Sequence, residues 1–364
     1  MLPKILLNPV YRFLASVDRY ISREVDALQR ANENGVTDRF LWCLDANAKT
    51  LPSIDFSIAD LKREVRKRVG EGFPIGVAFK AESYSQNYEG DVSQADYGFR
   101  IKFNDPSQTD LAIKNWSATY FMQSKVAKIP ERGKEWDLRA TFTRTSGQPE
   151  AIDRLRSLVG PRGLLYHLYC PPGALRLADD SALFKSVMAK GTDHREPSVY
   201  WRSGFWLAKD FPANLGSLFS SEVHPTPWSL FVLSHFFDVQ AHDGLIIAPE
   251  RLYEGQTSKE AQFREDLFNR DRKAVEDAFG IQVQNDENKK AILDRYFEAQ
   301  PHRTVSMDIS FPTLDYDKSM QTGIAAEDER IPDFDGEAEN EDEHKRSKHD
   351  NDGLPKGMTP SGTG

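Results

Sequence analysis

The run from residue 96 to residue 103 constrains the fold of this chain more than any other stretch. Asp96 precedes seven residues in which the odd positions are apolar and the even positions are small or charged. An apolar residue at every second position predicts a β-strand with one buried face. The next four residues, 104–107, read Asn-Asp-Pro-Ser and favour a turn after this strand.

Three more elements are expected after this turn. Residues 116–126 form a second run rich in aromatic and β-branched residues, and it carries Gln123 and Lys125 near its end. We expect a helix at about 152–158 and an apolar strand at 164–170. The order is therefore strand, turn, strand, helix and strand, with an acid at the first strand and Gln-x-Lys on the second.

This order of elements and polar residues resembles the core of the PD-(D/E)XK nucleases. The form it resembles is the Mrr-like variant of restriction and phage-defence nucleases, which has Gln-x-Lys in place of Glu-x-Lys. The resemblance covers about residues 20–170, which is under half of the chain. It implies an α/β fold with a restriction-endonuclease-like mixed sheet flanked by helices. It also implies a Mg²⁺-dependent nuclease that acts on DNA in preference to RNA, in restriction or phage defence.

The chemistry of such a nuclease gives each residue of the motif a role. Phosphodiester cleavage requires charge neutralisation at the phosphate and an activated water, and a hard cation such as Mg²⁺ (or Mn²⁺) supplies both. By the resemblance, Asp96 offers the cation a carboxylate and Gln123 offers a neutral amide oxygen. Lys125 shares a face with Gln123, because side chains alternate along a strand. It could orient or deprotonate the water, or stabilise the developing charge.

The family carries a further acid on the helix before the first strand, and three glutamates are candidates here. Glu33 lies just before an expected helix and is followed by Thr-Asp, as in related nucleases. Glu24 lies near the apolar stripe of the preceding helix, and Glu89 lies shortly upstream of the strand. We favour Glu33. The expected catalytic residues are then Asp96, Gln123, Lys125 and Glu33, and the expected metal ligands are Asp96, Gln123 and Glu33.

Three helices and a strand are expected before this motif. Residues 11–32 have apolar positions at helical spacing, and Thr37 is suited to cap a second helix that reaches residue 48. A third helix, 58–70, carries Lys or Arg at five positions of one face, which could follow a phosphate backbone or form an ordinary solvated face. A short strand is expected at 73–79.

The second half of the chain is expected to hold further helices and a strand. We expect a buried helix at 228–237, another helix at 286–299 and a strand at 304–311. We also expect a long and mostly charged helix from a capping box at 257–260 to just before Gly280, which lies on the surface or against a partner. Four potential metal ligands cluster here without a recognisable spacing, and we interpret the histidines among them as core or surface residues. They are His224, His235, Asp238 and His242.

Composition divides the chain and sets its surroundings. The net charge is −9, but residues 327–364 hold twelve acids and five bases, so the remainder carries only about −2 and can present a basic groove. We expect a nuclease-like core at 1–170, an α/β or α-rich extension at 171–315 and a disordered acidic tail at 316–364. The two cysteines, Cys43 and Cys170, lie among apolar neighbours, which predicts buried thiols in a reducing compartment. With no apolar run long enough to span a bilayer, we expect a cytoplasmic protein that avoids membranes.

Three functions remain open. The first is a Mg²⁺-dependent endonuclease whose partner is nucleic acid, DNA in particular, with a partner protein or a second copy of the chain as a further option. The second is a catalytically inactive module that binds nucleic acid or a protein, because glutamine in place of glutamate removes one negative charge from a metal site. In a third interpretation, the acidic tail mimics nucleic acid.

Overall fold

The computed structural model describes residues 4–28, 32–45, 54–69, 74–84, 95–105, 114–129, 135–144, 146–174, 176–178, 204–220, 223, 225–236, 250–253, 258–279, 287–298 and 303–312. All of them belong to one compact unit, Met1–Leu314. Among the helices in these ranges, none combines the length and hydrophobicity that a membrane crossing requires.

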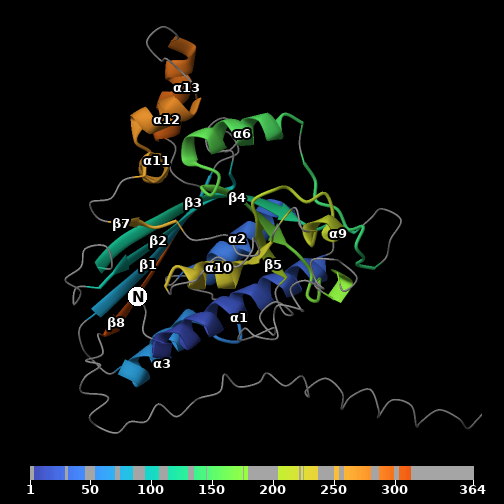
Figure 1. The fold of residues 1–364 in the computed structure, drawn as a ribbon, viewed down its shortest axis with the longest axis vertical. Helices are drawn as coiled ribbons and strands as arrows, with labels where there is room; N and C mark the ends of the chain where they lie inside the picture. Colours follow the sequence, from blue (N-terminus) through green and yellow to red (C-terminus); the bar gives the residue numbers. More distant parts are fainter. Residues whose placement is uncertain are drawn as a thin grey trace, which may run out of the picture. The chain divides into compact units, whose positions relative to one another are not determined.

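The described strands form one open mixed sheet (Figure 1). Its order is β6-β5-β4-β3-β2-β1-β8, and β7 pairs with the beginning of β3. Only β3 and β4 run parallel; the other neighbours are antiparallel. The strands are β1 (Pro74–Ser83), β2 (Tyr97–Asn104), β3 (Asn115–Val126), β4 (Leu164–Tyr169), β5 (Phe205–Ala208), β6 (Thr226–Pro227), β7 (Leu252–Tyr253) and β8 (Arg303–Pro312).

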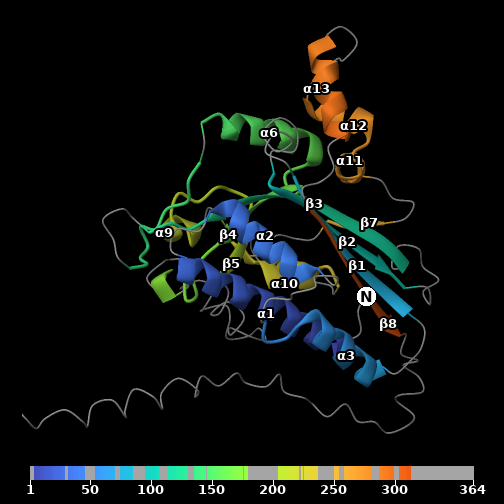
Figure 2. The same cartoon turned by 180° about the vertical axis from the view of Figure 1, so that it is seen from behind.

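Helices cover both faces of this sheet (Figures 1 and 2). One face packs against α1 (Lys4–Leu28), α2 (Glu33–Leu44), α3 (Ile58–Val69) and α10 (Trp228–Ser234). The opposite face packs against α6 (Gln148–Val159), α11 (Lys259–Phe268) and α12 (Arg272–Phe279). The remaining described helices are the short α9 (Leu215–Leu218), a 3-10 turn at Arg176–Ala178, and α13 (Glu287–Glu298). The protein is therefore a mixed α/β protein with a mostly antiparallel sheet between helices.

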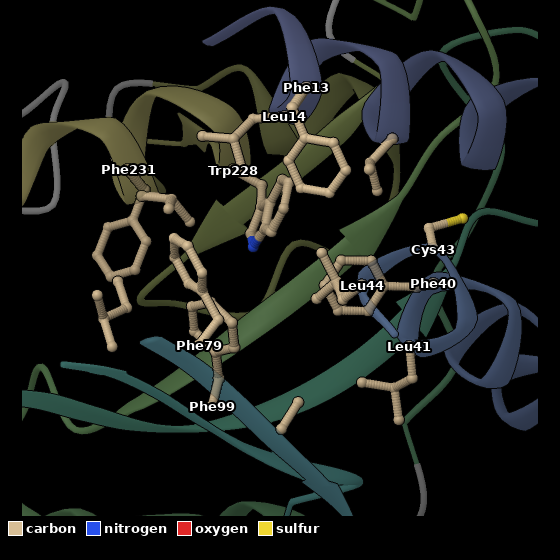
Figure 3. Packing of buried hydrophobic residues seen from close by; sticks show 14 of the residues in the cluster. Phe13, Leu14, Phe40, Leu41, Cys43, Leu44, Phe79, Phe99, Trp228 and Phe231 are labelled. Carbon is tan, nitrogen blue, oxygen red and sulfur yellow. The ribbon is translucent and has the colours of Figure 1, made fainter. Parts of the chain in front are cut away.

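The core on the first face follows the periodicity of the sequence. The stripe of α1 that was expected to face inward is buried, including Phe13, Leu14 and Val17. Figure 3 shows Phe13 and Leu14 above the aromatic side chains that rise from the sheet and from α2 and α10. The helix begins before the predicted residue 11, since its first turns run through Pro9. Burial of this apolar stripe, at about 25 cal/mol per Å², is the main force that holds α1 on the sheet.

The predicted strand at 97–103 is confirmed as β2, but its second face is also buried. The odd residues Tyr97 and Phe99 lie in the first core as expected. On the opposite side a Cβ at Gly98 would lie 2.2 Å from the Tyr84 hydroxyl and 2.8 Å from the Phe268 ring. The α11 helix therefore packs where the sequence pattern suggested solvent, and only glycine fits beneath it.

The second helix is confirmed, but its start and its cap at Thr37 were predicted wrongly. The α2 helix begins at Glu33, because the Asn32 side chain accepts a 2.6 Å hydrogen bond from the Gly35 amide and caps the first turn. Thr37 is therefore inside the helix and buried. This shift of one turn moves Glu33 from a loop into the first turn of the helix.

The single long surface helix was also predicted wrongly. The chain forms two helices, α11 and α12, which are separated at Arg270, a residue with a φ of 61°. Asp271 caps the second helix by accepting a 3.1 Å hydrogen bond from the Ala274 amide. Two charged residues of α11, Arg264 and Glu265, are buried against the sheet. The opposite side of this helix, with Lys259, Glu260 and Gln262, is exposed.

Strands from both sides of residue 170 lie in the same sheet. β8 pairs with β1 along its whole length, from Pro74↔Pro312 to Ser83↔Arg303, and β5 pairs with β4. The predicted strand at 304–311 is thus confirmed, and the division expected at residue 170 does not separate two sheets. The acidic tail at 316–364 lies outside the described residues.

Candidate functional site

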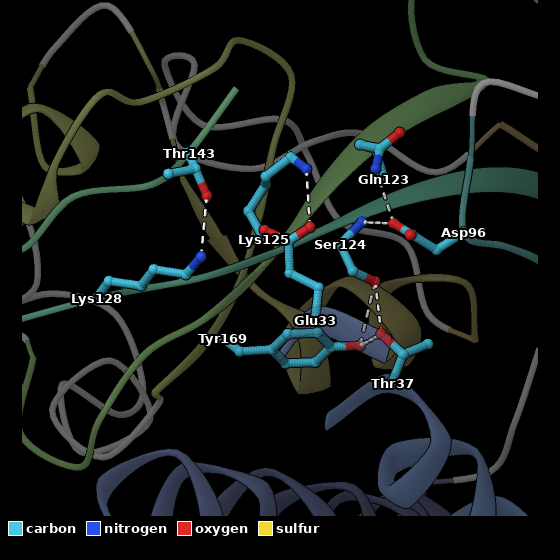
Figure 4. Close-up of polar contacts among 9 residues, drawn as sticks. All are labelled: Glu33, Thr37, Asp96, Gln123, Ser124, Lys125, Lys128, Thr143 and Tyr169. Carbon is cyan, nitrogen blue, oxygen red and sulfur yellow. Dashed lines mark hydrogen bonds and ion pairs between the residues drawn. The ribbon is translucent and has the colours of Figure 1, made fainter. Parts of the chain in front are cut away.

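Asp96 and Gln123 meet where β2 begins and β3 ends. The two strands are antiparallel, with Tyr97 opposite Met122, so the residue before β2 lies beside the end of β3. The Gln123 amide donates to the Asp96 carboxylate at 2.8 Å, and the backbone amide of Ser124 donates to the same oxygen, Oδ2 (Figure 4). The sequence-predicted pair is therefore in direct contact, and two N–H groups fix the carboxylate.

Lys125 and Glu33 form a second pair beside the first. Lys125 Nζ lies 3.0 Å from Glu33 Oε2, and this contact joins the end of β3 to the first turn of α2 (Figure 4). The lysine side chain is only 5% exposed, whereas that of Glu33 is 22% exposed. A buried ammonium group requires a charged partner, and Glu33 provides it while keeping some contact with water.

A cluster of hydroxyl groups places α2 against β3. The Thr37 hydroxyl donates to Ser124 Oγ at 2.9 Å and lies 3.1 Å from the Tyr169 hydroxyl, and all three residues are buried. Burial raises the pKa of the Tyr169 phenol above its ordinary value of 10.0, so the phenol stays protonated and can donate a hydrogen bond. Because Thr37 lies one helical turn after Glu33, this contact sets the position of the glutamate relative to Lys125.

Sequence reasoning missed this hydroxyl cluster. It assigned Thr37 a capping role and gave Ser124 none. The alternation of side chains along the strand was the available signal. Ser124 lies between Gln123 and Lys125, so its side chain points to the opposite face, where a buried hydroxyl needs a hydrogen-bond partner.

The donor set suits a hard cation in part. Gln123 Oε1 is buried without a hydrogen-bond partner, although Nε2 of the same amide is engaged. An orphaned amide oxygen beside a fixed carboxylate, with a second carboxylate on the adjacent helix, offers only oxygen ligands, which Mg²⁺ prefers. Within the described residues, however, no group of three or more His, Cys, Asp or Glu side chains is arranged to hold a metal ion. The Glu33 carboxylate contacts Lys125, so the carboxylates of Asp96 and Glu33 do not form one closed set of metal ligands.

The alternative acids do not join this cluster. Glu24 forms an ion pair with Arg39, which links α1 to α2. Glu89 lies outside the described residues. Glu33 is therefore the one of the three candidates that contacts a residue of the motif in the described part of the chain.

Histidine burial agrees with the core interpretation for His235. Its Nε2 lies 2.7 Å from the Tyr120 hydroxyl and its Nδ1 lies 2.9 Å from the Phe231 carbonyl oxygen. Burial lowers the pKa of His235 to about 3, so the ring is neutral. The other members of that group, His224, Asp238 and His242, lie outside the described residues.

The basic face of α3 is partly neutralised on its own helix. Arg63 pairs with Asp60, and both Lys67 and Arg68 lie within ion-pair distance of Glu64. Exposed pairs of this kind each contribute about 0–1 kcal/mol and reduce the field that a phosphate backbone would meet. They favour the interpretation of this helix as a solvated face.

Comparison of the chain with protein-family models, with curated proteins and with solved structures finds no match. The structure shows two contacts among the four predicted residues, Asp96 with Gln123 and Lys125 with Glu33.

Proposed function

We propose that this protein is a metal-dependent nuclease whose site is formed by Asp96, Gln123, Lys125 and Glu33. The observation that carries the proposal is the orphaned, buried amide oxygen of Gln123 next to Asp96, with the Lys125–Glu33 pair two residues further along the same strand. Unpaired buried polar atoms are rare in folded proteins and need a reason. A ligand position for a cation is such a reason.

The topology supports the same proposal. β1, β2 and β3 form an antiparallel meander, α6 follows β3, and β4 returns parallel to β3. A helix, three antiparallel strands, a crossover helix and a parallel strand is the order that a restriction-endonuclease-like core requires. Likeness of topology does not by itself establish an activity, so the site residues carry the argument.

Each side chain has a defined role in the proposed site. Asp96, Gln123 and Glu33 would hold Mg²⁺ or Mn²⁺, which when bound would neutralise phosphate charge and lower the pKa of a water. The hydrogen bonds from Gln123 and Ser124 keep the Asp96 carboxylate oriented. Lys125 lies on the strand face of Gln123, where its ammonium can hold a phosphate oxygen or the attacking water once Glu33 turns from it.

Cleavage assays with matched variants test this proposal. Supercoiled plasmid, linear duplex, single-stranded DNA and RNA are incubated with the wild-type protein, with Lys125→Met and with Glu33→Gln, in the presence of Mg²⁺ or Mn²⁺. Glu24→Gln is the control, because Glu24 is the rejected candidate and contacts Arg39 instead. We expect metal-dependent cutting that falls on the order of 100-fold or more in the first two variants and stays unchanged in the control. Equal cutting by all four proteins would refute the site.

A binding module without catalysis is the second candidate, and two observations favour it. Lys125 is engaged by Glu33, and no closed set of three or more His, Cys, Asp or Glu ligands exists in the described part of the chain. A wild-type protein that binds nucleic acid but cuts none of the four substrates with either metal would favour this function.

A further inference from the structure

Three basic side chains close to the candidate site have no carboxylate partner among the described residues. They are Lys128, Arg144 and Arg156, and their contacts are with neutral groups. Lys128 Nζ donates to the Thr143 hydroxyl at 3.3 Å, Arg144 donates to the Tyr166 hydroxyl at 3.4 Å, and Arg156 donates to the Lys209 carbonyl oxygen. These hydrogen bonds hold the cations in place and leave their charge uncompensated, unlike the paired cations on α3.

The sheet places these cations beside the proposed ligands. Tyr166 of β4 is the direct neighbour of Gln123 in the parallel ladder, so both side chains project from the same face. The Arg156 guanidinium lies 5.6 Å from the Tyr166 ring. Tyr166 packs edge-to-face on Phe211 at 5.3 Å, and the Arg144 guanidinium lies 4.9 Å from the Phe211 ring. Two arginines are thus fixed on an aromatic pair one strand away from Gln123.

Lys128 extends the same basic region past the end of β3. It follows Lys125 by three residues, and its backbone bridges to Thr141, which brings residues 141–144 alongside. Figure 4 shows Lys128 and Thr143 on the side of Lys125 that is away from Asp96. Asp96, Lys125, Lys128 and the 141–144 segment therefore follow one another in this order.

This arrangement suits a polyanion. Arg144 is exposed and Arg156 is partly exposed, so both can meet a ligand while their aromatic contacts limit their motion. The acids Glu150 and Asp153 lie on the same helix as Arg156, yet no ion pair joins either of them to this group in the described residues. A fixed guanidinium loses less entropy when it binds a phosphate, and it can bind two oxygens at once.

We propose that Lys128, Arg144 and Arg156 form the surface that holds the phosphate backbone of a DNA strand next to the candidate metal site. The choice of DNA rests on the proposed nuclease function. Contacts with phosphates carry no sequence information, so this surface positions the strand and does not select a base sequence. Phe211 and Tyr166 are positioning residues, because their rings hold the Arg144 and Arg156 guanidinium groups in place.

Equilibrium binding without metal tests this surface separately from catalysis. Fluorescence anisotropy measures binding of a labelled duplex of about 20 base pairs to the full chain in EDTA, from about 50 to 200 mM salt. Single-stranded DNA and RNA of the same length form parallel arms. The variants are Arg144→Gln, Arg156→Gln and Lys128→Gln. Arg154→Gln is the matched control, because Arg154 is exposed on the same helix as Arg156 and contacts neither aromatic ring.

Each of the three variants is expected to bind DNA more weakly and to reduce the slope of log K against log salt by about 0.9, the value for one phosphate contact. The control is expected to match the wild type. Arg144→Lys and Arg156→Lys are expected to retain the wild-type slope, because each keeps its charge, but to bind more weakly than the wild type, because lysine lacks the guanidinium fork that the ring holds in place. Melting temperatures of all variants exclude loss of folding as the cause.

The outcomes separate this inference from the proposed function. A wild-type protein that does not bind nucleic acid, or glutamine variants of Lys128, Arg144 and Arg156 that keep the wild-type slope, would overturn the surface even if Asp96-dependent cutting is found. Arginine-dependent binding by a chain that never cuts would support the surface and refute the nuclease. Tighter binding of RNA than of duplex or single-stranded DNA would overturn the assignment to DNA.

Discussion

Gln123→Glu tests whether the end of β3 is a metal site without relying on activity. The substitution keeps the shape of the side chain and replaces the amide that donates to Asp96 at 2.8 Å by a second carboxylate. Two charges at that distance would repel by about 6 kcal/mol at an effective dielectric constant of about 20. Gln123 is only 2% exposed, so water cannot screen this repulsion.

Protonation limits the loss of stability. Holding a proton on a glutamate of ordinary pKa, about 4.3, costs about 3.7 kcal/mol at about pH 7 and about 1 kcal/mol at about pH 5. The introduced carboxyl group therefore has a pKa in the folded state that is raised above its unfolded value. Its protonated form can donate to Asp96, so stability is retained below about pH 4 and is lost as the pH rises. We expect the free energy of unfolding to fall by about 3.7 kcal/mol at about pH 7 and by about 1 kcal/mol or less at about pH 5.

A bound cation should reverse this loss. At about 10 mM Mg²⁺, a dissociation constant of about 0.1 mM in the folded state would restore about 2.7 kcal/mol. Urea unfolding of the wild type and the variant, at both pH values and with Mg²⁺ or EDTA, measures each of these differences. The account predicts a larger Mg²⁺ stabilisation in the variant than in the wild type, since the variant offers one more charged ligand.

Gln262→Glu is the matched control for this experiment. The Gln262 amide donates to Asp266 at 2.7 Å, nearly the same geometry, but on the exposed surface of α11. There the new charge should cost only about 0.2–0.5 kcal/mol. Equal small losses in both variants, or an equal effect of Mg²⁺ on both, would refute the reasoning about Gln123.

Three further predictions concern the surroundings of the site. Thr37→Val should lower the free energy of unfolding by about 1–3 kcal/mol in urea titration, because its two buried hydroxyl partners each lose a hydrogen bond; a change below that range would show that the cluster does not fasten α2. Burial raises the pKa of Cys43 to about 12 and also raises that of Cys170 well above its ordinary value of 9.0. A thiol reagent at about pH 8 should therefore label neither cysteine in the native protein and both in denaturant, and labelling in the native state would contradict this burial. Because burial lowers the pKa of His235 to about 3, the unfolded state takes up a proton first, and the free energy of unfolding should fall as the pH drops from about 6.5 towards 3. His235→Gln should flatten the decline of the melting temperature between these pH values. An unchanged decline would rule out His235 as its cause.

Periodicity and motif order predicted the elements that hold the site. Alternation at 97–103 gave β2 and its buried odd residues, and helical spacing gave the inward stripe of α1. The pairing of Asp96 with Gln123 could be predicted because an antiparallel connection brings the start of one strand to the end of the next. These are local patterns, and local patterns are what a sequence displays directly.

The remaining features depend on contacts between segments far apart in the chain. The burial of Gly98 arises from α11, which lies more than 150 residues later in the sequence. The partnership of Thr37 with Ser124 joins residues 87 positions apart. The contact of Tyr166 with Phe211 likewise follows the pairing of β4 with β5, and the parallel register of β3 and β4 places Tyr166 beside Gln123. No periodicity within one segment encodes such a register, so the basic surface could not be predicted from the sequence.

The most direct test of the central claim is cleavage of supercoiled plasmid by the wild-type protein and by Asp96→Asn, with Mg²⁺ and with EDTA, at equal protein concentration. The account predicts nicking or linearisation that needs Mg²⁺ and disappears in the variant, while both proteins remain folded by circular dichroism. Plasmid cut at the same rate by both proteins, or left intact by the wild type with Mg²⁺ and with Mn²⁺, would contradict the claim that Asp96 and its neighbours form a nuclease site.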